Sequence, residues 1–133
     1  MVSDRLKAVA NECQDATSKK TIHYCEDPYG PCKDLYVGAY TIDAYNIIIY
    51  CPVWFHLPAI KYNCDGLSSF NRAGIVVHEM THHSNVCSPA TVDYGYGTDK
   101  VVGLSGAKQI LNADNFALYT MDLEAGCGID ENL

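Results

Sequence analysis

The chain has 133 residues, of which 48% are apolar, and a formal net charge of −7 from 9 basic and 16 acidic side chains. This length and composition predict one globular domain over residues 1–133 and exclude a disordered chain. The acidic balance argues against nucleic-acid binding through a basic face and favours cationic substrates if charge matters at all. An acidic surface that simply keeps the protein soluble explains the charge about equally well.

The chain begins with a predicted helix that Ser3 caps and that ends before residue 17, because apolar residues recur at helical spacing: Leu6, Val9, Ala10 and Cys13. Three strands are expected next, over residues 21–24, 35–42 and 46–51. The last of them is the clearest, because it is a run of β-branched side chains. Residues 43–45 fit a hairpin link between the last two strands.

The second half of the chain predicts an aromatic loop and two helices. The loop covers residues 53–57 between two prolines. A helix from about residue 71 to residue 84 follows, with Ser68 or Ser69 as its cap, and a long loop leads to a last helix. Ser105 caps that helix and Gly126 ends it, and its apolar positions are Ile110, Leu111, Phe116, Ala117, Met121 and Leu123. A small twisted sheet, an active-site helix and a C-terminal helix together predict an α+β fold.

The seven cysteines are scattered, at positions 13, 25, 32, 51, 64, 87 and 127. No Cys-x-x-Cys pair occurs, so the spacing favours disulfides over a thiolate zinc site. Disulfides indicate an oxidising compartment, and we therefore expect a secreted, extracellular protein. No run reaches the roughly eighteen apolar residues that a membrane span needs, and the N-terminus shows no apolar signal segment.

The segment Val-Val-His-Glu-Met-Thr-His-His at residues 76–83 contains a His-Glu-x-x-His motif in an apolar, helix-compatible run. His78 and His82 lie one helical turn apart on one face, so both imidazoles can hold one metal ion. Glu79 can then take a proton from a water on that ion, as in zinc metallopeptidases. The alternative is a helix whose histidines only satisfy hydrogen bonds in the core. Chance predicts on the order of 0.01 such matches, which favours the metal site.

A catalytic zinc ion takes three protein ligands and keeps one position open. No histidine follows His83, and His83 points about 100° away from the motif histidines, which indicates a structural or exposed side chain. The third ligand is therefore expected from the following loop, where Asp93 and Asp99 are the candidates. Tyr96 can point its hydroxyl at the same open position and stabilise the oxyanion of a tetrahedral intermediate.

The motif helix and the loop Ala-Thr-Val-Asp-Tyr-Gly-Tyr-Gly at residues 90–97 together resemble the aspzincin metallopeptidases, the deuterolysin family of secreted fungal proteases. The family pattern is HExxH followed by GTxDxxYG. The chain matches it at Thr91, Asp93, Tyr96 and Gly97, and departs from it at Ala90. The similarity extends over roughly residues 24–120 and includes an Asn-Ala-Asp motif at residues 112–114. Family members carry more helical sequence ahead of this region, so the chain is expected to be a compact variant or a trimmed catalytic portion.

The resemblance implies a zincin-like fold and a zinc-dependent endopeptidase with one catalytic Zn²⁺. It makes His78, His82 and Asp93 the zinc ligands. Glu79 becomes the general base, and Tyr96 becomes the donor to the transition state.

The resemblance leaves two roles for Asp114: a carboxylate near the ligands or the substrate pocket, or a helix residue that bonds the loop, which we favour. In members that cut beside lysine, an acidic residue three places further on completes the lysine pocket. This chain has Ala117 there, so strict lysine specificity is not expected. The resemblance also implies a Cys32–Cys51 disulfide, and a Cys13–Cys25 pair is plausible from its local spacing.

We expect a monomer that acts on protein or peptide substrates, with basic ones favoured by its charge, and that binds neither nucleic acid nor membranes. The substrate is expected to pair with a sheet edge near residues 46–50. A second hypothesis is a secreted binding protein or effector that retains the zinc-bound protease fold, although binding alone gives no reason for Glu79. A purely structural zinc site would require a fourth protein ligand.

Overall fold

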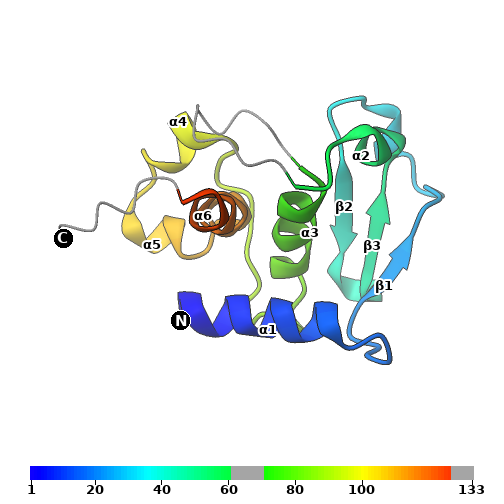
Figure 1. Ribbon diagram of the computed structural model, residues 1–133. Helices are drawn as coiled ribbons and strands as arrows, with labels where there is room; N and C mark the ends of the chain where they lie inside the picture. The colour runs from blue at the N-terminus through cyan, green and yellow to red at the C-terminus, as the bar shows by residue number, and fades with distance from the viewer. Residues whose placement is uncertain (61–70, 127–133) are drawn as a thin grey trace.

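The computed structural model describes residues 1–60 and 71–126, and Figure 1 shows a helical part packed beside a small sheet. The elements in chain order are α1 (Val2–Gln14), β1 (Ile22–Tyr24), η1 (Pro31–Lys33), β2 (Ala39–Ile42), η2 (Asp43–Tyr45), β3 (Ile47–Tyr50), α2 (Pro52–His56), α3 (Arg72–Thr81), α4 (Thr98–Val101), α5 (Gly106–Gln109) and α6 (Ala113–Ala125). This mixture confirms the predicted α+β class. Within the described ranges, no helix combines the length and apolarity that crossing a membrane requires.

The three strands form one sheet in the order β1-β3-β2. β1 runs parallel to β3, whereas β2 runs antiparallel to it with Ala39 opposite Tyr50. The central place of β3 follows from its sequence, because Ile48 and Ile49 point to opposite faces and both are fully buried. The expectation that a substrate would pair along residues 46–50 is therefore wrong, since both sides of β3 are occupied. β1 and β2 are the two outer strands, and of these β2 is the one that lies beside α3 (Figure 1).

Three predicted elements have different bounds in the structure. The strand expected over residues 35–42 begins only at Ala39, because Pro31 starts a 3₁₀ turn and the chain turns again at Asp34, whose carboxylate accepts the Tyr36 amide. The expected aromatic loop is helix α2, with Pro52 at its first position, where a missing amide hydrogen costs nothing. The single last helix is in fact two, α5 and α6, with Asn112 as the N-cap of α6.

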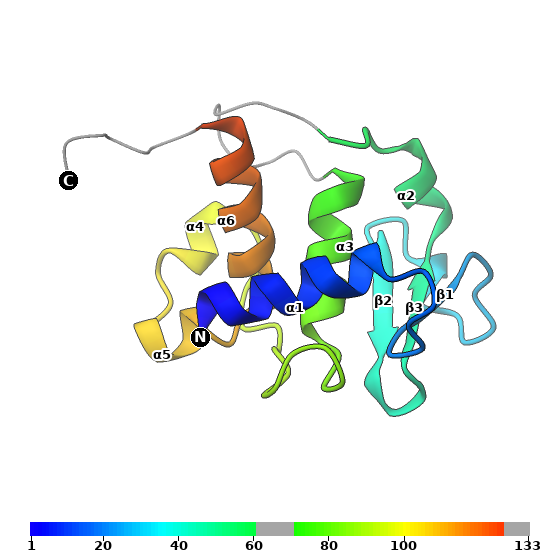
Figure 2. The same cartoon turned by 60° about the horizontal axis from the view of Figure 1, so that its bottom comes forward.

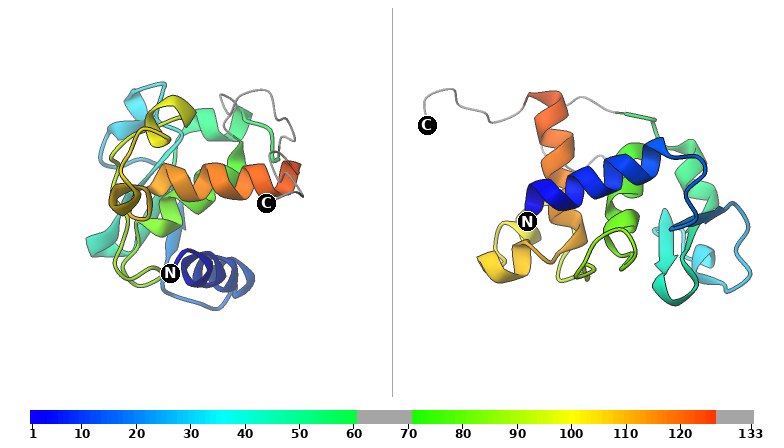
Figure 3. Two further views of the ribbon diagram at one scale, coloured as in Figure 1. Left: turned by 90° about the vertical axis from the view of Figure 1, so that its left-hand side faces the viewer. Right: turned by 90° about the horizontal axis from the view of Figure 1, so that it is seen from below.

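Helix α3 lies between the sheet and α6 (Figures 1 and 3). Its N-cap is Asn71, whose side-chain oxygen accepts the Gly74 amide at 2.7 Å. The predicted caps, Ser68 and Ser69, lie outside the described residues. Gly74 lets α6 approach closely, because a Cβ at this position would lie 2.7 Å from Met121 Sδ. The helix ends at Thr81, three residues before the predicted end.

Helix α1 crosses the lower side of α3 and α6 (Figure 2). It begins at Val2 with Met1 as its N-cap, so the predicted Ser3 cap is wrong. Arg5 is buried on this face, and its guanidinium donates to the carbonyls of Ile110 and Pro89 and packs over the Phe116 ring. Arg5 thus fixes α1 to the loops that flank the candidate site.

The core lies between α1, α3 and the sheet, and its buried members are Val9, Ala39, Ile48, Tyr50, Ile75, Met80 and Cys87. The disulfide Cys32–Cys51 closes the segment that leads into β2 and β3, which confirms the predicted pair. Cys13 and Cys25 are free thiols, so the Cys13–Cys25 pair suggested by local spacing is wrong.

Candidate active site

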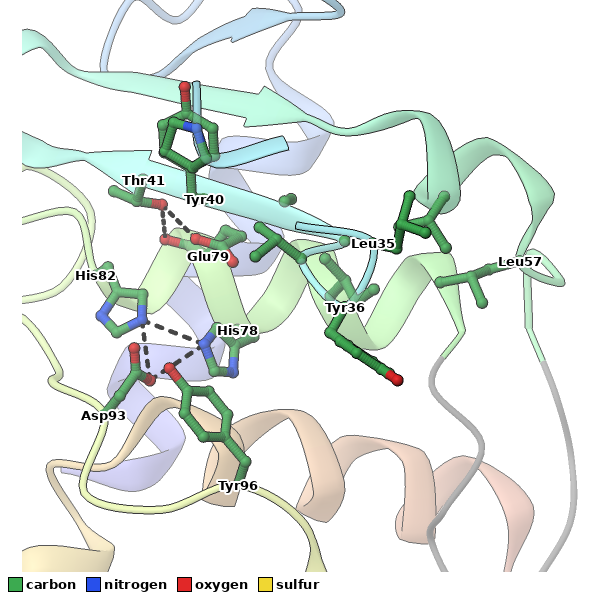
Figure 4. A pocket seen from close by; sticks show the side chains of 16 residues that line it. Leu35, Tyr36, Tyr40, Thr41, Leu57, His78, Glu79, His82, Asp93 and Tyr96 are labelled. Atoms are coloured by element: carbon green, nitrogen blue, oxygen red, sulfur yellow. Dashed lines mark hydrogen bonds and ion pairs between the residues drawn. The ribbon is translucent and has the colours of Figure 1, made fainter. Parts of the chain in front are cut away.

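A cavity of about 850 Å³ opens between β2, α3 and the loop that follows α3. The predicted site residues line its wall, as Figure 4 shows: His78, Glu79, His82, Asp93 and Tyr96. The rest of the wall is largely apolar and comes from Pro31, from residues 35–41, from α2 and its C-terminal end, and from Ile75 on α3. The cavity therefore joins a polar cluster to an apolar groove along the outer strand.

The two motif histidines face each other, with their Nε2 atoms 3.2 Å apart. Asp93 completes the cluster, because its Oδ1 lies 3.2 Å from Nε2 of His78 and 3.3 Å from Nε2 of His82. These donor atoms all lie within 4.8 Å of one another. Asp99, the other candidate ligand, is exposed in the first turn of α4. The structure thus brings Asp93, and not Asp99, to the histidine pair.

The far nitrogen of each imidazole has its own partner. Nδ1 of His78 lies 3.1 Å from Oδ1 of Asp114, and Nδ1 of His82 lies 3.0 Å from the Thr91 carbonyl oxygen. When the imidazoles are neutral and Nδ1 donates to an oxygen, each Nε2 offers a lone pair on the side of the Asp93 carboxylate. Lone pairs and a carboxylate that converge in this way fit a divalent cation, and partners at the far nitrogens are typical of histidines that bind metals.

The pKa shifts within the cluster also support the binding of a cation there. Burial alone would lower the pKa of His78, but hydrogen bonds to Asp114 and Asp93 outweigh it and raise the pKa to about 10. The pKa of His82 also rises, because its contacts with Asp93 and the Thr91 carbonyl outweigh burial. Burial would raise the pKa of Asp93, yet the two histidines lower it. The cluster therefore favours positive charge, whether from protons or from a metal ion.

Glu79 lies on the cavity wall with only 5% of its surface exposed. Thr41 of β2 donates its hydroxyl to Oε2 of Glu79 at 2.8 Å, and the same hydroxyl lies 3.0 Å from the Glu79 carbonyl oxygen (Figure 4). Burial raises the pKa of Glu79 against the opposing effects of His78 and this hydrogen bond. The carboxyl group is thus suited to exchange a proton. Sequence reasoning missed Thr41, which is 38 residues away from Glu79 in the chain.

Tyr96 stacks on His78, with ring centroids 5.9 Å apart and ring planes at 16°. Burial raises the pKa of its phenol, and a hydrogen bond to Asp93 raises it further, so the hydroxyl stays protonated as a donor. Tyr94, two residues earlier, instead packs under the Lys108 ammonium, 5.3 Å from its ring centroid. Of these two tyrosines, the structure places Tyr96 at the cluster.

Asp114 links His78 to the loop that follows α3. It is fully buried, and while Oδ1 contacts His78, Oδ2 accepts the Gly97 amide at 2.6 Å. Asn112, which sequence reasoning did not single out, holds the same loop. Its side chain accepts the amides of Tyr94 and Gly95 and donates to the Gly95 carbonyl. The only sequence signal for Asn112 is its place in the Asn-Ala-Asp motif.

His83 is not part of the cavity wall and is fully buried, so of the two expected positions, structural or exposed, the structure shows the buried one. Its Nδ1 is 3.6 Å from Oδ1 of Asp43. Both ring nitrogens are without a hydrogen-bond partner among the described residues. His83 therefore belongs to the packing of the segment just after α3 against η2, and the structure does not add it to the site.

Comparison with known proteins places this geometry in a family. The model of the deuterolysin metalloprotease (M35) family matches residues 1–127. A neutral protease 2 homolog of Botryotinia fuckeliana and penicillolysin of Penicillium citrinum are each 41% identical over 128 residues. Each alignment covers 96% of this chain and 35% of the relative, so the chain spans about a third of the length of these proteins.

A solved structure, the zinc peptidase from Grifola frondosa, has the same fold with a TM-score of 0.60. The alignment covers 92% of this chain and 71% of that one, with 22% sequence identity. This likeness supports the predicted zincin-like architecture, a small sheet beside an active-site helix. With the family match over nearly the whole sequence, the chain belongs to the deuterolysin metalloprotease (M35) family.

Proposed function

We propose that this chain is a zinc-dependent endopeptidase domain. The observation that carries the proposal is the convergence of two imidazole nitrogens and one carboxylate oxygen beside a buried glutamate in an open cavity. His78, His82 and Asp93 would hold one Zn²⁺, with three protein ligands as in catalytic sites. Bound there, zinc would polarise the scissile carbonyl and lower the pKa of the attacking water.

Glu79 is the general base of this mechanism. It is buried beside the ligand cluster, and it would take the proton of the attacking water and pass it to the leaving amine. Tyr96 is the donor to the developing oxyanion. The protonated phenol of Tyr96 lies against His78 and Asp93, which is where the charge of the transition state would develop.

The substrate main chain would pair with β2. The Cys51 amide donates to the Gly38 carbonyl at 2.9 Å, so Gly38 and every second residue after it direct their backbone groups toward β3. Ala39 and Thr41 lie between them, and their amides and carbonyls therefore face the open edge. A peptide that adds to this edge would run past Glu79 and the ligand cluster.

Protein and peptide substrates fit an open cavity that borders a strand edge. The net charge of −7 favours basic ones. We propose that the protein acts outside the cell, since the Cys32–Cys51 disulfide is typical of oxidising compartments.

Digestion of casein and protamine by the purified chain tests the proposal. Activity should depend on added zinc and disappear with a chelator. Glu79→Ala should keep zinc and lose at least about 10²-fold in kcat, the low end expected for a general base. Glu26→Ala, at an exposed glutamate, is the matched control and should leave kcat unchanged. A chain that binds zinc but cuts neither protein would instead support the hypothesis of a binding protein or effector.

A further inference from the structure

Thr41 lies on the open edge of β2 and also contacts the buried Glu79. Its backbone belongs to β2, opposite Ile48, where the amide and carbonyl point away from β3 toward the open edge. Its side chain points to α3 and reaches Glu79 (Figure 4). The same residue is therefore in contact with the proposed substrate strand on one side and with the proposed general base on the other.

The hydroxyl of Thr41 contacts Glu79 at two points, and its single hydrogen is shared between two acceptor oxygens. It lies 2.8 Å from Oε2 and 3.0 Å from the carbonyl oxygen of Glu79, which belongs to the last turn of α3. This carbonyl also accepts the His82 amide at 3.1 Å, so the Thr41 hydroxyl is a second donor to it. A contact to both the backbone and the carboxylate of one residue limits the rotamers that its side chain can adopt.

The carboxylate needs such a contact. A glutamate side chain has three rotatable bonds, and fixing it in one conformation costs entropy. Among residues 1–60 and 71–126, Thr41 is the side-chain donor to this carboxylate, and it engages Oε2 alone. Oε1 is then left for the attacking water. A donor on only one oxygen suits a base that must be both held and available.

We infer that Thr41 is a positioning residue for the peptidase reaction: its hydroxyl sets the orientation of Glu79 relative to the strand edge on which the substrate lies. The inference rests on the proposed function for its catalytic consequence, but its geometric consequence can be observed without activity. Thr41 acts through Glu79, and within the described residues no side-chain hydrogen bond joins it to the proposed metal ligands, so its removal should change turnover without changing metal binding.

Thr41→Val is the principal variant, because valine keeps the branched shape and strand propensity and removes only the hydroxyl. We expect kcat to fall roughly 10- to 100-fold, the loss typical of a catalytic group displaced by about 1 Å, while KM changes less than about 3-fold. Thr41→Ser restores the hydroxyl and should restore most of kcat. If Thr41→Val does not fold, Thr41→Ala replaces it in the same comparison.

Thr21→Val is the matched control. Thr21 also donates its hydroxyl to a buried carboxylate, Oε1 of Glu12 at 2.8 Å, but this pair is not part of the cavity wall. Loss of the Thr21 hydroxyl in Thr21→Val should lower thermal stability as much as Thr41→Val does, and it should leave kcat unchanged. A similar fall of kcat in both variants would show that general destabilisation is responsible and would overturn the inference.

Two further readouts separate the possible causes. Zinc affinity, measured by competition with a chromophoric chelator, should be the same in Thr41→Val and in the wild type, and its loss would overturn the inference. Crystal structures should show Glu79 in one rotamer in the wild type and Thr41→Ser, and displaced in Thr41→Val. An unmoved Glu79 in Thr41→Val would also overturn it. If the wild type itself lacks chelator-sensitive activity, the proposed function fails, and the crystal structures still decide the role of Thr41.

Discussion

Asp114 holds the far nitrogen of His78, with its Oδ1 3.1 Å from Nδ1 of the imidazole. The carboxylate is fully buried, and its other oxygen accepts the Gly97 amide in the loop that carries Asp93 and Tyr96. One side chain at the start of α6 therefore orients a candidate ligand on α3 and fixes the loop that supplies another. Because α6 packs directly on α3, this arrangement is built into the main helix interface.

Asp114→Asn should lower zinc affinity about 10- to 100-fold, the usual cost of removing a partner from a metal-binding histidine. The amide can keep one hydrogen bond, but its NH₂ group cannot accept from Gly97, and its neutral oxygen no longer raises the basicity of His78. Asp99→Asn, at an exposed carboxylate, should bind zinc as the wild type does. Zinc titration of the metal-free proteins checks both, and equal affinities in all three would remove Asp114 from this role.

Asp93→Ala should abolish stoichiometric zinc binding, because within residues 1–60 and 71–126 Asp93 is the carboxylate whose oxygen lies within 3.3 Å of both Nε2 atoms. Asp99→Ala should bind one zinc ion per chain. Metal analysis after dialysis measures this directly. Full zinc content in Asp93→Ala, together with its loss in Asp99→Ala, would exchange the roles of the two residues.

Tyr96→Phe should reduce kcat by about 10² if its hydroxyl stabilises the oxyanion, with zinc content unchanged. Phenylalanine retains the stacking on His78, so the change isolates the hydroxyl. Tyr94→Phe is the control, since the Tyr94 ring packs under Lys108 and its loop is held by Asn112 through the backbone. Steady-state kinetics on a peptide substrate distinguish the two, and an unchanged kcat in Tyr96→Phe contradicts the oxyanion role.

The parts of the site that depend on local spacing could be predicted from the sequence. Two histidines four residues apart on a helix must share a face, so the convergence of His78 and His82 follows from helical geometry alone. The choice between Asp93 and Asp99 did not follow from spacing, because it depends on a loop path fixed from a distance. That path is set where Val92 pairs with Asn112 and where the Asn112 side chain binds Tyr94 and Gly95.

The main error was to expect a free sheet edge near residues 46–50, although the signal against it is present in the sequence. The run Ile47–Ile49 is apolar at every position, as in a strand buried on both faces, and such a strand belongs in the middle of a sheet. An edge strand carries polar groups toward solvent or a site, as β2 does with Tyr40 and Thr41. The contact between Thr41 and Glu79 then depends on long-range packing of the sheet against α3, for which no local pattern exists.

Asp27 gives the segment before β2 a measurable dependence on pH. Its carboxylate accepts the amides of Tyr29, Gly30 and Cys32 and the hydroxyl of Tyr40. Burial alone would raise the pKa of Asp27, but these hydrogen bonds outweigh burial and lower it to about 2, from an ordinary value of 3.8. The folded protein therefore prefers the charged carboxylate.

Because the pKa of Asp27 is lower in the folded than in the unfolded protein, its charged carboxylate stabilises the fold above about pH 4. This stabilisation is lost as the pH falls toward 2. Asp27→Asn should therefore unfold at a lower temperature than the wild type at pH 5, and the difference should shrink between pH 4 and pH 2. Glu26→Gln, at the exposed neighbouring carboxylate, should follow the wild type throughout. Thermal unfolding followed by circular dichroism measures all three. A difference for Asp27→Asn that stays constant from pH 5 to pH 2 would show that the charge of Asp27 is not what stabilises this segment.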